Sequence, residues 1–262
     1  MTDVRAMTEV LGADKPASRS SYRVVVERLA SVQKSSRGAP GYSRWINRRL
    51  GRYIAAWAYL RGLTPNQVTA ISASMTFTGI AGLALMRPSA LLAITIVALL
   101  LAGYAFDSAD GQLARLRGGG TPAGEFLDHV VDCFKVSGMH LAVLIGWFRY
   151  YDLSHAGYLL IPMCFTLVSA AFFFSVILSE QLRRGHTAKV LGSGSKDGRA
   201  PVLRSVLVLP WDYGVLCLTF ALWPIHVAFG VVYSAMLMAN VVLLAVALGN
   251  WYREMSRLVT RG

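Results

Sequence analysis

The chain has 262 residues, of which 55% are hydrophobic and only 15% are charged, and its formal net charge is +12. Its mean hydropathy of +0.47 excludes an ordinary soluble domain, and the basic excess requires no nucleic-acid partner because a basic surface beside an anionic membrane leaflet accounts for it. The composition therefore predicts an all-α integral membrane protein.

Residues 1–40 are polar and show no clear periodicity, so we expect a loosely ordered N-terminal arm with at most a short helix near 21–33. No apolar stretch in this arm is long enough for the core of a signal peptide. The arm is therefore expected to be retained. The rest of the chain, residues 41–262, is expected to form one membrane domain that ends in a short C-terminal tail.

An amphipathic helix is predicted over residues 41–62, just before the first apolar stretch. Its aromatic and aliphatic residues recur at helical spacing, with arginines between them: Tyr42, Trp45, Ile46, Leu50, Tyr53, Ile54, Trp57 and Leu60. Such a stripe suits a helix that lies in the membrane interface. A helix that binds a partner protein is the alternative.

Six apolar stretches follow, each about the length of roughly 20 residues that a helix needs to cross a bilayer. They cover residues 67–86, 89–106, 124–147, 156–179, 203–223 and 227–250. The first is expected to begin at Thr64, as helix cap, with Pro65 at the first helical position. The fold class predicted is a bundle of six transmembrane helices preceded by an interfacial amphipathic helix.

The basic residues predict the orientation of this bundle. With six spans, 23 of the 26 Lys and Arg residues fall on the side that holds both termini. By the positive-inside rule this side is cytoplasmic. We expect an integral protein of a bacterial-type plasma membrane, with both termini cytoplasmic.

The stretch DSADGQLARLRGGGTPAGEFLDHVVD, residues 107–132, concentrates acidic residues at the cytoplasmic rim of the second and third spans. Helical spacing places two aspartates on one face of the second helix and two on one stripe of the third. The glycine-rich turn, followed by the helix-start residues Thr121 and Pro122, makes these helices antiparallel neighbours. Four aspartates are therefore expected to converge on one cleft: Asp107, Asp110, Asp128 and Asp132.

Carboxylates this close together need positive compensation, and the single nearby Arg115 does not suffice. Oxygen ligands favour hard cations, so we expect Mg²⁺ or Mn²⁺. We expect two such ions, because a pair of metal ions is a common arrangement for displacement at phosphorus. The small residues Gly111, Ala114 and Gly124 leave room for a phosphate-bearing substrate, and Arg115 is a suitable donor to its oxygens. The alternative is a buried ion network or close helix packing through small residues.

The spacing Asp107-x2-Asp110-Gly111-x2-Ala114-Arg115-x8-Gly124-x3-Asp128-x3-Asp132 resembles the complete signature of the CDP-alcohol phosphotransferase family, and all eight fixed positions match. We call these eight residues the signature. TPNQVT, residues 64–69, resembles the sequence that commonly opens the first span in that family. The six spans and the helix before them are also similar to its architecture.

The resemblance implies a reaction in which a CDP-linked donor gives its substituted phosphate to an acceptor alcohol and CMP leaves. It implies metal binding by Asp107, Asp110, Asp128 and Asp132, with Asp132 also the catalytic base, and a CDP site formed by Gly111, Ala114, Arg115 and Gly124. The donor is expected to be CDP-diacylglycerol, in phospholipid biosynthesis. A non-lipid or polyol phosphodiester made by the same chemistry is the alternative product.

The acceptor alcohol is the least constrained partner. Six basic residues form a cluster in or beside the loop between the fourth and fifth spans: Arg183, Arg184, Lys189, Lys196, Arg199 and Arg204. A phosphorylated acceptor would suit Lys189, Arg199 and Arg204 among them. The positive-inside rule alone predicts the same residues. Asp212 is expected to bond a neighbouring helix or, as a second reading, to shape a polar cavity. Membrane lipids are expected around the chain. The sequence allows a homodimer but does not predict one.

Two other functions deserve comparison. A membrane prenyltransferase also uses aspartates, metal and diphosphate, but would show two separate acidic motifs and more spans. A cation transporter would place acids near the membrane centre on several helices. One acidic motif at one rim favours the phosphotransferase.

Overall fold

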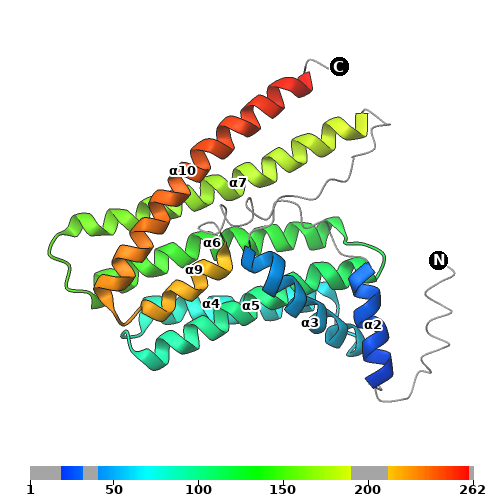
Figure 1. Ribbon diagram of the computed structural model, residues 1–262, viewed down its shortest axis with the longest axis horizontal. Coiled ribbons are helices and arrows are strands. Elements are labelled where there is room, and N and C mark those ends of the chain that lie inside the picture. The colour runs from blue at the N-terminus through cyan, green and yellow to red at the C-terminus, as the bar shows by residue number, and fades with distance from the viewer. Residues whose placement is uncertain (1–18, 32–40, 190–211, 260–262) are drawn as a thin grey trace.

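The computed structural model describes residues 19–31, 41–189 and 212–259, which form helices joined by short turns (Figure 1). No β-strand occurs within these three ranges. The all-α fold class is thereby confirmed. The predicted division at residue 40 between an arm and a membrane domain stays a prediction.

Within the described residues, five helices are long and apolar enough to cross a membrane. They are α4 (Pro65–Leu85), α5 (Ala90–Leu116), α6 (Pro122–Tyr150), α7 (Leu160–Lys189) and α10 (His226–Val259). At about 1.5 Å per residue, even the shortest of them spans roughly 30 Å, the thickness of the hydrocarbon layer. This set of helices is that of an integral membrane protein.

The predicted count of six spans is not confirmed. The stretch expected at 203–223 falls partly on residues 190–211, which lie outside the described ranges. Its described part is a short helix, α9 (Tyr213–Thr219), continued by a 3₁₀ turn, η4 (Phe220–Leu222). Together they are too short to cross the hydrocarbon layer.

Two helices begin where the sequence predicts, and for the predicted reason. The Thr64 hydroxyl accepts a hydrogen bond from the backbone N–H of Gln67 at 3.3 Å, and the Gln67 side chain accepts one from the Thr64 N–H at 2.8 Å. Thr121 caps α6 in a similar way by accepting from the Gly124 N–H at 3.1 Å. These caps satisfy N–H groups that have no partner within the helix.

Close packing joins α4 to α5 and α6. A Cβ atom at Gly103 of α5 would collide with the Thr76 hydroxyl and lie 3.1 Å from the Ser72 carbonyl, and one at Gly146 of α6 would lie 2.6 Å from the Leu83 carbonyl. Small residues of this kind let membrane helices approach closely. The three helices therefore form a tight unit with α4 in contact with both others.

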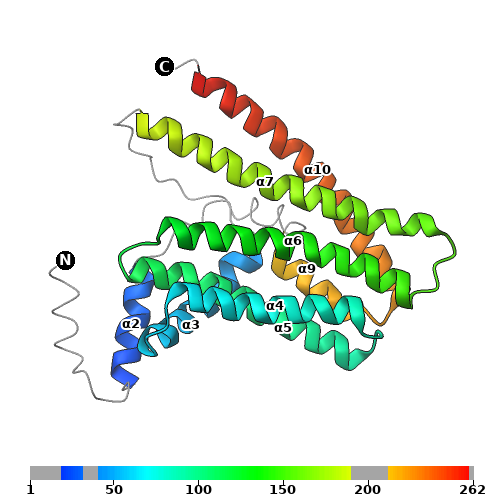
Figure 2. The same ribbon diagram turned by 180° about the vertical axis from the view of Figure 1, so that it is seen from behind.

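Helices α7 and α10 run side by side and diverge from this three-helix unit (Figures 1 and 2). At the end where they meet it, Trp147 packs edge-on against Phe229 and Tyr233, with ring centroids 6.1 Å and 5.9 Å away. Near the other end, Arg183 of α7 donates to Glu254 of α10 at 3.2 Å. The acidic stretch thus lies where the helices spread apart.

The region before α4 contains helix α2 (Arg19–Ser31), a π-helical turn η1 (Ser43–Asn47) and helix α3 (Arg48–Leu60). α2 lies close to residues 21–33, where the sequence predicts at most a short helix. α3 packs against α5 with its small residues Gly51, Ala55 and Ala58 buried. The opposite side exposes large apolar side chains, as an interfacial helix requires: Trp45, Ile46, Leu50, Tyr53 and Trp57.

Candidate functional site

The signature folds as a helical hairpin. The first half lies on the last turns of α5, which continues ten residues beyond the predicted span end at 106, and the second half opens α6. In the turn between them, Gly118 and Gly119 have φ values of 98° and 126°, which favour glycine. Both helices pack more closely against α4 than against each other. Side chains from the two helices can therefore meet in the space between them.

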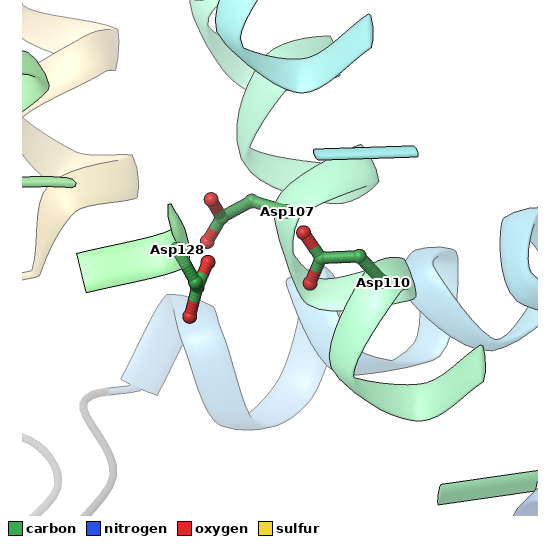
Figure 3. Close-up of side chains that lie close together, drawn as sticks. All are labelled: Asp107, Asp110 and Asp128. Atoms are coloured by element: carbon green, nitrogen blue, oxygen red, sulfur yellow. The ribbon is translucent and has the colours of Figure 1, made fainter. Parts of the chain in front are cut away.

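Three of the four predicted aspartates meet in that space. Asp107 and Asp110 of α5 and Asp128 of α6 each offer a carboxylate oxygen, and these oxygens lie within 4.8 Å of one another. Figure 3 shows the three carboxylates approaching one another from the two helices. An all-oxygen group at this spacing fits a hard divalent cation. We call these residues the three-aspartate group.

Asp110 is the most buried member of the group, with 6% of its surface exposed. Its Oδ2 accepts a 2.5 Å hydrogen bond from the Thr69 hydroxyl of α4, and its Oδ1 accepts one from the Gly111 N–H at 2.5 Å. Burial of a carboxylate is costly unless its oxygens are bonded. Thr69 is a site residue that sequence reasoning did not assign, although it is the last residue of the TPNQVT stretch.

Asp132 lies one helical turn beyond Asp128 on α6, beside the three-aspartate group. Its Oδ1 accepts from the Lys135 ammonium at 3.2 Å, and Lys135 also donates to Asp107. Lys135 falls within the apolar stretch predicted at 124–147, and sequence reasoning gave it no role. The available signal was a charged residue inside an apolar stretch, which is functional by default.

A pocket of about 570 Å³ opens beside the three-aspartate group. This volume falls in the usual range for small-molecule sites of roughly 300–1,000 Å³. All four residues predicted for the CDP site line it: Gly111, Ala114, Arg115 and Gly124. The start of α4 contributes Thr64, Pro65, Asn66 and Thr69 to the same wall. We call this cavity the signature pocket.

Arg115 is one of three arginines that line the signature pocket, with Arg117 and Arg184. Its Nε is buried and has no hydrogen-bond partner among the described residues. A buried donor without a partner is costly. An anionic ligand in the pocket would supply acceptors for this guanidinium.

Ion pairs join α6 and α7 at the rim of the pocket. Arg184 of α7 lies 2.6 Å from Glu125 of α6 and 2.6 Å from Glu180 of its own helix. Glu125 also lies 3.7 Å from His129. The side chains of Arg184 and Glu125 are about half exposed, so the pairs close the rim only loosely. Sequence reasoning did not assign any of these acidic residues.

The residues predicted to bind the acceptor cannot be placed. Arg199 and Arg204 lie outside the described residues, and Lys189 is the last residue of α7, with only its backbone described. Of the same basic cluster, Arg183 and Arg184 form ion pairs with acidic residues. The acceptor assignment stays a prediction.

Asp212 caps α9 and bonds the N-terminal region. It accepts from the Gly214 N–H at 3.0 Å and from the Ser43 N–H of η1 at 3.2 Å. A Cβ atom at Gly214 would collide with the Tyr42 ring, so η1 and α9 are in close contact. These bonds agree with the first reading of Asp212, a bond to a neighbouring helix. It also lines a smaller, mostly apolar cavity with His140 and Asn240. The second reading, in which Asp212 shapes a polar cavity, stays a prediction.

A sequence model of the CDP-alcohol phosphatidyltransferase family matches residues 62–251. The match begins just before α4 and ends within α10, so it includes the complete signature. A comparison with curated proteins found no match.

Two solved structures of phosphatidylinositol phosphate synthase from Mycobacterium tuberculosis are similar to this chain. The complex of that enzyme with manganese and citrate is 23% identical, with 76% of this chain and 87% of that chain covered and a TM-score of 0.47. The complex with CDP-DAG bound is also 23% identical, with 79% and 94% covered and a TM-score of 0.49.

Proposed function

The chain belongs to the CDP-alcohol phosphatidyltransferase family, and we propose that it transfers a phosphatidyl group from CDP-diacylglycerol to the hydroxyl of an acceptor alcohol, with release of CMP. As a member of this family it is a transferase of substituted phosphate groups. The proposal adds the identity of the donor, the metal requirement and the roles of individual residues.

One observation carries the proposal: the three-aspartate group stands at the wall of a pocket lined by the four non-acidic residues of the signature. Asp110 and Asp128 belong to the group and also line the pocket, next to Gly111, Ala114, Arg115 and Gly124. A ligand in the pocket would therefore contact both the carboxylates and the guanidinium. A diphosphate with an attached nucleoside needs that combination of metal ligands, a cation and space.

The donor would bind through its diphosphate and its nucleoside. The Arg115 guanidinium is suited to a phosphate oxygen because it offers several N–H donors in a fixed plane. Gly111 and Gly124 leave the helix backbone accessible at the pocket, where a side chain would take up space. The synthase structure with CDP-DAG bound shows that a protein of similar fold accepts such a donor.

The metal ions would be held by the three-aspartate group, with Asp132 as a further ligand. Bound divalent ions stabilise the negative charge on the oxygens that attack and leave a phosphorus atom. Mg²⁺ and Mn²⁺ suit these ligands. The similar synthase structure in complex with manganese supports this choice.

Asp132 would act as the base. It takes the proton of the acceptor hydroxyl while the acceptor oxygen forms a bond to the phosphorus of the phosphatidyl group, and the bond from that phosphorus to the CMP oxygen breaks. Its contact with Lys135 involves Oδ1, which leaves Oδ2 for the proton. Asp132 lies one turn beyond Asp128, deeper along α6, where an acceptor could approach from the other side of the carboxylates.

We propose that the signature pocket faces the cytoplasm, because 23 of the 26 basic residues belong to that side in a six-span topology. Cysteines introduced singly at Gly119 and Ser154, after replacement of the three native ones, would test this. Gly119 lies between α5 and α6 and Ser154 between α6 and α7, at opposite ends of α6. We expect an impermeant reagent outside the cell to label position 154 and not 119; the reverse pattern would contradict the orientation.

The reaction can be tested with the protein purified in detergent. CDP-diacylglycerol and Mg²⁺ are supplied with one candidate alcohol at a time, and CMP is measured together with the lipid product. We expect CMP release that depends on one alcohol, with one phosphatidyl product per CMP. The residues Lys189, Arg199 and Arg204 are proposed to favour a phosphorylated alcohol. Failure to release CMP with every phosphorylated and unphosphorylated alcohol would contradict the proposed function.

A further inference from the structure

Lys135 is a lysine in the interior of α6 with 5% of its surface exposed. It is absent from the signature, and the proposed reaction assigns it no role. A charged side chain within a membrane-spanning helix is costly unless it has partners. Its partners therefore indicate its function.

The ammonium group contacts one acceptor on each of three helices. It donates to the Ser72 hydroxyl of α4 at 3.2 Å and to Asp132 Oδ1 of α6 at 3.2 Å, and it also donates to Asp107 Oδ1 of α5. A lysine ammonium has three N–H donors, so all three are used. Ser72 donates its own hydroxyl hydrogen to the Gly103 carbonyl at 2.9 Å, which leaves an oxygen lone pair for Lys135.

This arrangement is built into the close contact between α4 and α5. Gly103 lets α5 approach α4 so closely that a side chain there would meet Ser72 and Thr76. The close approach fixes the Ser72 hydroxyl, and thereby one of the three acceptors of Lys135. The position of the ammonium is thus set by backbone packing as well as by charge.

The four signature aspartates form two overlapping sets, the three-aspartate group and the pair that contacts the ammonium. Asp110 and Asp128 do not contact it, Asp132 contacts it and lies outside the three-aspartate group, and Asp107 belongs to both sets. A cation bound by the three-aspartate group finds two carboxylates without a competing ammonium. A cation that also requires Asp132 must share both Asp132 and Asp107 with Lys135.

We propose that Lys135 is a built-in cation of this site, which neutralises Asp107 and Asp132 and makes the affinities for a first and a second divalent ion unequal. The inference rests on the proposed function, because that function supplies the divalent ions. Repulsion between an ammonium and a divalent cation at a few ångströms is large at the edge of a membrane protein, where water screens it incompletely. The first ion therefore binds well and the second binds weakly.

The test is a titration of the purified, substrate-free protein with Mn²⁺, followed by calorimetry for the affinities and by electron paramagnetic resonance for the number of bound ions. Wild type is compared with Lys135→Met, which removes the charge, and Lys135→Arg, which keeps it. Arg149→Met is the matched control, because it removes a positive charge from the exposed far end of the same helix. No substrate or turnover is involved.

We expect wild type to bind one Mn²⁺ tightly and a second at least about tenfold more weakly, and Lys135→Met to tighten the second site by about tenfold or more. Lys135→Arg and Arg149→Met should both retain the unequal pair of affinities. Two ions bound equally by wild type, or an unchanged second affinity in Lys135→Met, would overturn the inference.

The outcomes separate this inference from the function on which it rests. Wild type that binds no divalent ion contradicts the proposed metal requirement. Wild type that binds two ions alike leaves that requirement intact and refutes only the role of Lys135. If Lys135→Met does not fold, the wild-type titration still tests the inference, because equal affinities there would overturn it.

Discussion

The Thr69 hydroxyl lies 2.5 Å from Asp110 Oδ2, so the first long helix directly orients the most buried carboxylate of the three-aspartate group. The Gly111 N–H fixes the other oxygen of that carboxylate. With both oxygens held, Asp110 keeps one rotamer even though like charges stand beside it. A residue outside the signature thereby determines how a signature residue is presented.

Thr69→Val should weaken divalent-ion binding by roughly ten- to a hundredfold, because hydrogen bonds to charged groups contribute about 1.5–3 kcal/mol. Calorimetric titration with Mn²⁺ measures the change. Thr78→Val is the control: Thr78 also lies on α4, and its hydroxyl lies 2.8 Å from the carbonyl four residues before it, as the Thr69 hydroxyl lies 3.1 Å from that of Pro65. Equal losses in the two variants would mean that the bond to Asp110 is unimportant.

Asp132→Asn should lower the rate of CMP release by about 10²–10⁴-fold at saturating Mg²⁺, which is the usual contribution of a general base. Asparagine retains Oδ1, the atom that accepts from Lys135, so the site should keep its shape and donor binding should survive. Asp107→Asn should instead weaken metal and donor binding together. Near wild-type turnover in Asp132→Asn would remove this residue from the role of base.

Removal of divalent ions should abolish transfer, because the clustered carboxylates would then lack the cations that hold the diphosphate. The experiment is exhaustive chelation followed by dialysis and a CMP assay. Activity should return on addition of Mg²⁺ or Mn²⁺ and should not return with Na⁺ at the same ionic strength. Full turnover in the chelated protein would contradict the metal requirement.

Gly124→Ala should raise the KM for CDP-diacylglycerol by about tenfold or more, because one methyl group in a tight pocket commonly changes binding by about 1–3 kcal/mol. The new Cβ would lie 3.2 Å from Asn66 Oδ1 and 3.3 Å from Thr121 Oγ1, so these two side chains must shift by a few tenths of an ångström. Steady-state kinetics measure the change. Gly249→Ala, with nothing within 4 Å, is the control and should leave KM unchanged.

Gly146→Ala should destabilise the whole fold and leave the chemistry of the surviving folded protein unchanged. Its Cβ would lie 2.6 Å from the Leu83 carbonyl and 2.7 Å from the Trp223 ring, and overpacking of this kind costs about 1–3 kcal/mol. Thermal unfolding in detergent should show a lower Tm than for Gly249→Ala. A Tm equal to that of wild type would show that α4 and α6 can separate without cost.

Much of the candidate site could be predicted because the signature consists of local spacings. A separation of three residues keeps Asp107 and Asp110 on one helix face whatever surrounds them, and a glycine-rich turn returns the chain so that Asp128 can meet them. The caps at Thr64 and Thr121 were predictable for the same reason, since a cap involves residues only three apart. The long apolar helices follow from composition and length.

The contacts between distant segments could not be predicted. The bond from Thr69 to Asp110 joins residues 41 positions apart, and that from Lys135 to Ser72 joins residues 63 apart. Both depend on how closely α4 approaches α5 and α6, which the glycine contacts of those helices determine. The spacing of residues along the sequence does not indicate how closely two helices approach each other.

The hydrogen bond between Ser43 and Asp212 joins residues 169 positions apart. Because the chain is made from its N-terminus, this contact can form only late in synthesis. A ribosome that adds about 5–20 residues per second needs roughly ten to thirty seconds to make the chain between them. During that time η1 and α3 have no Asp212 and no Gly214 surface to bind, although their exposed tryptophans can rest at the membrane surface. The Tyr42 ring stacks on Tyr104, one turn before Asp107, with centroids 6.2 Å apart, and Tyr104 packs against Tyr213 at 5.0 Å. This side of the candidate site is therefore completed late, after α4 to α7 have already been synthesised.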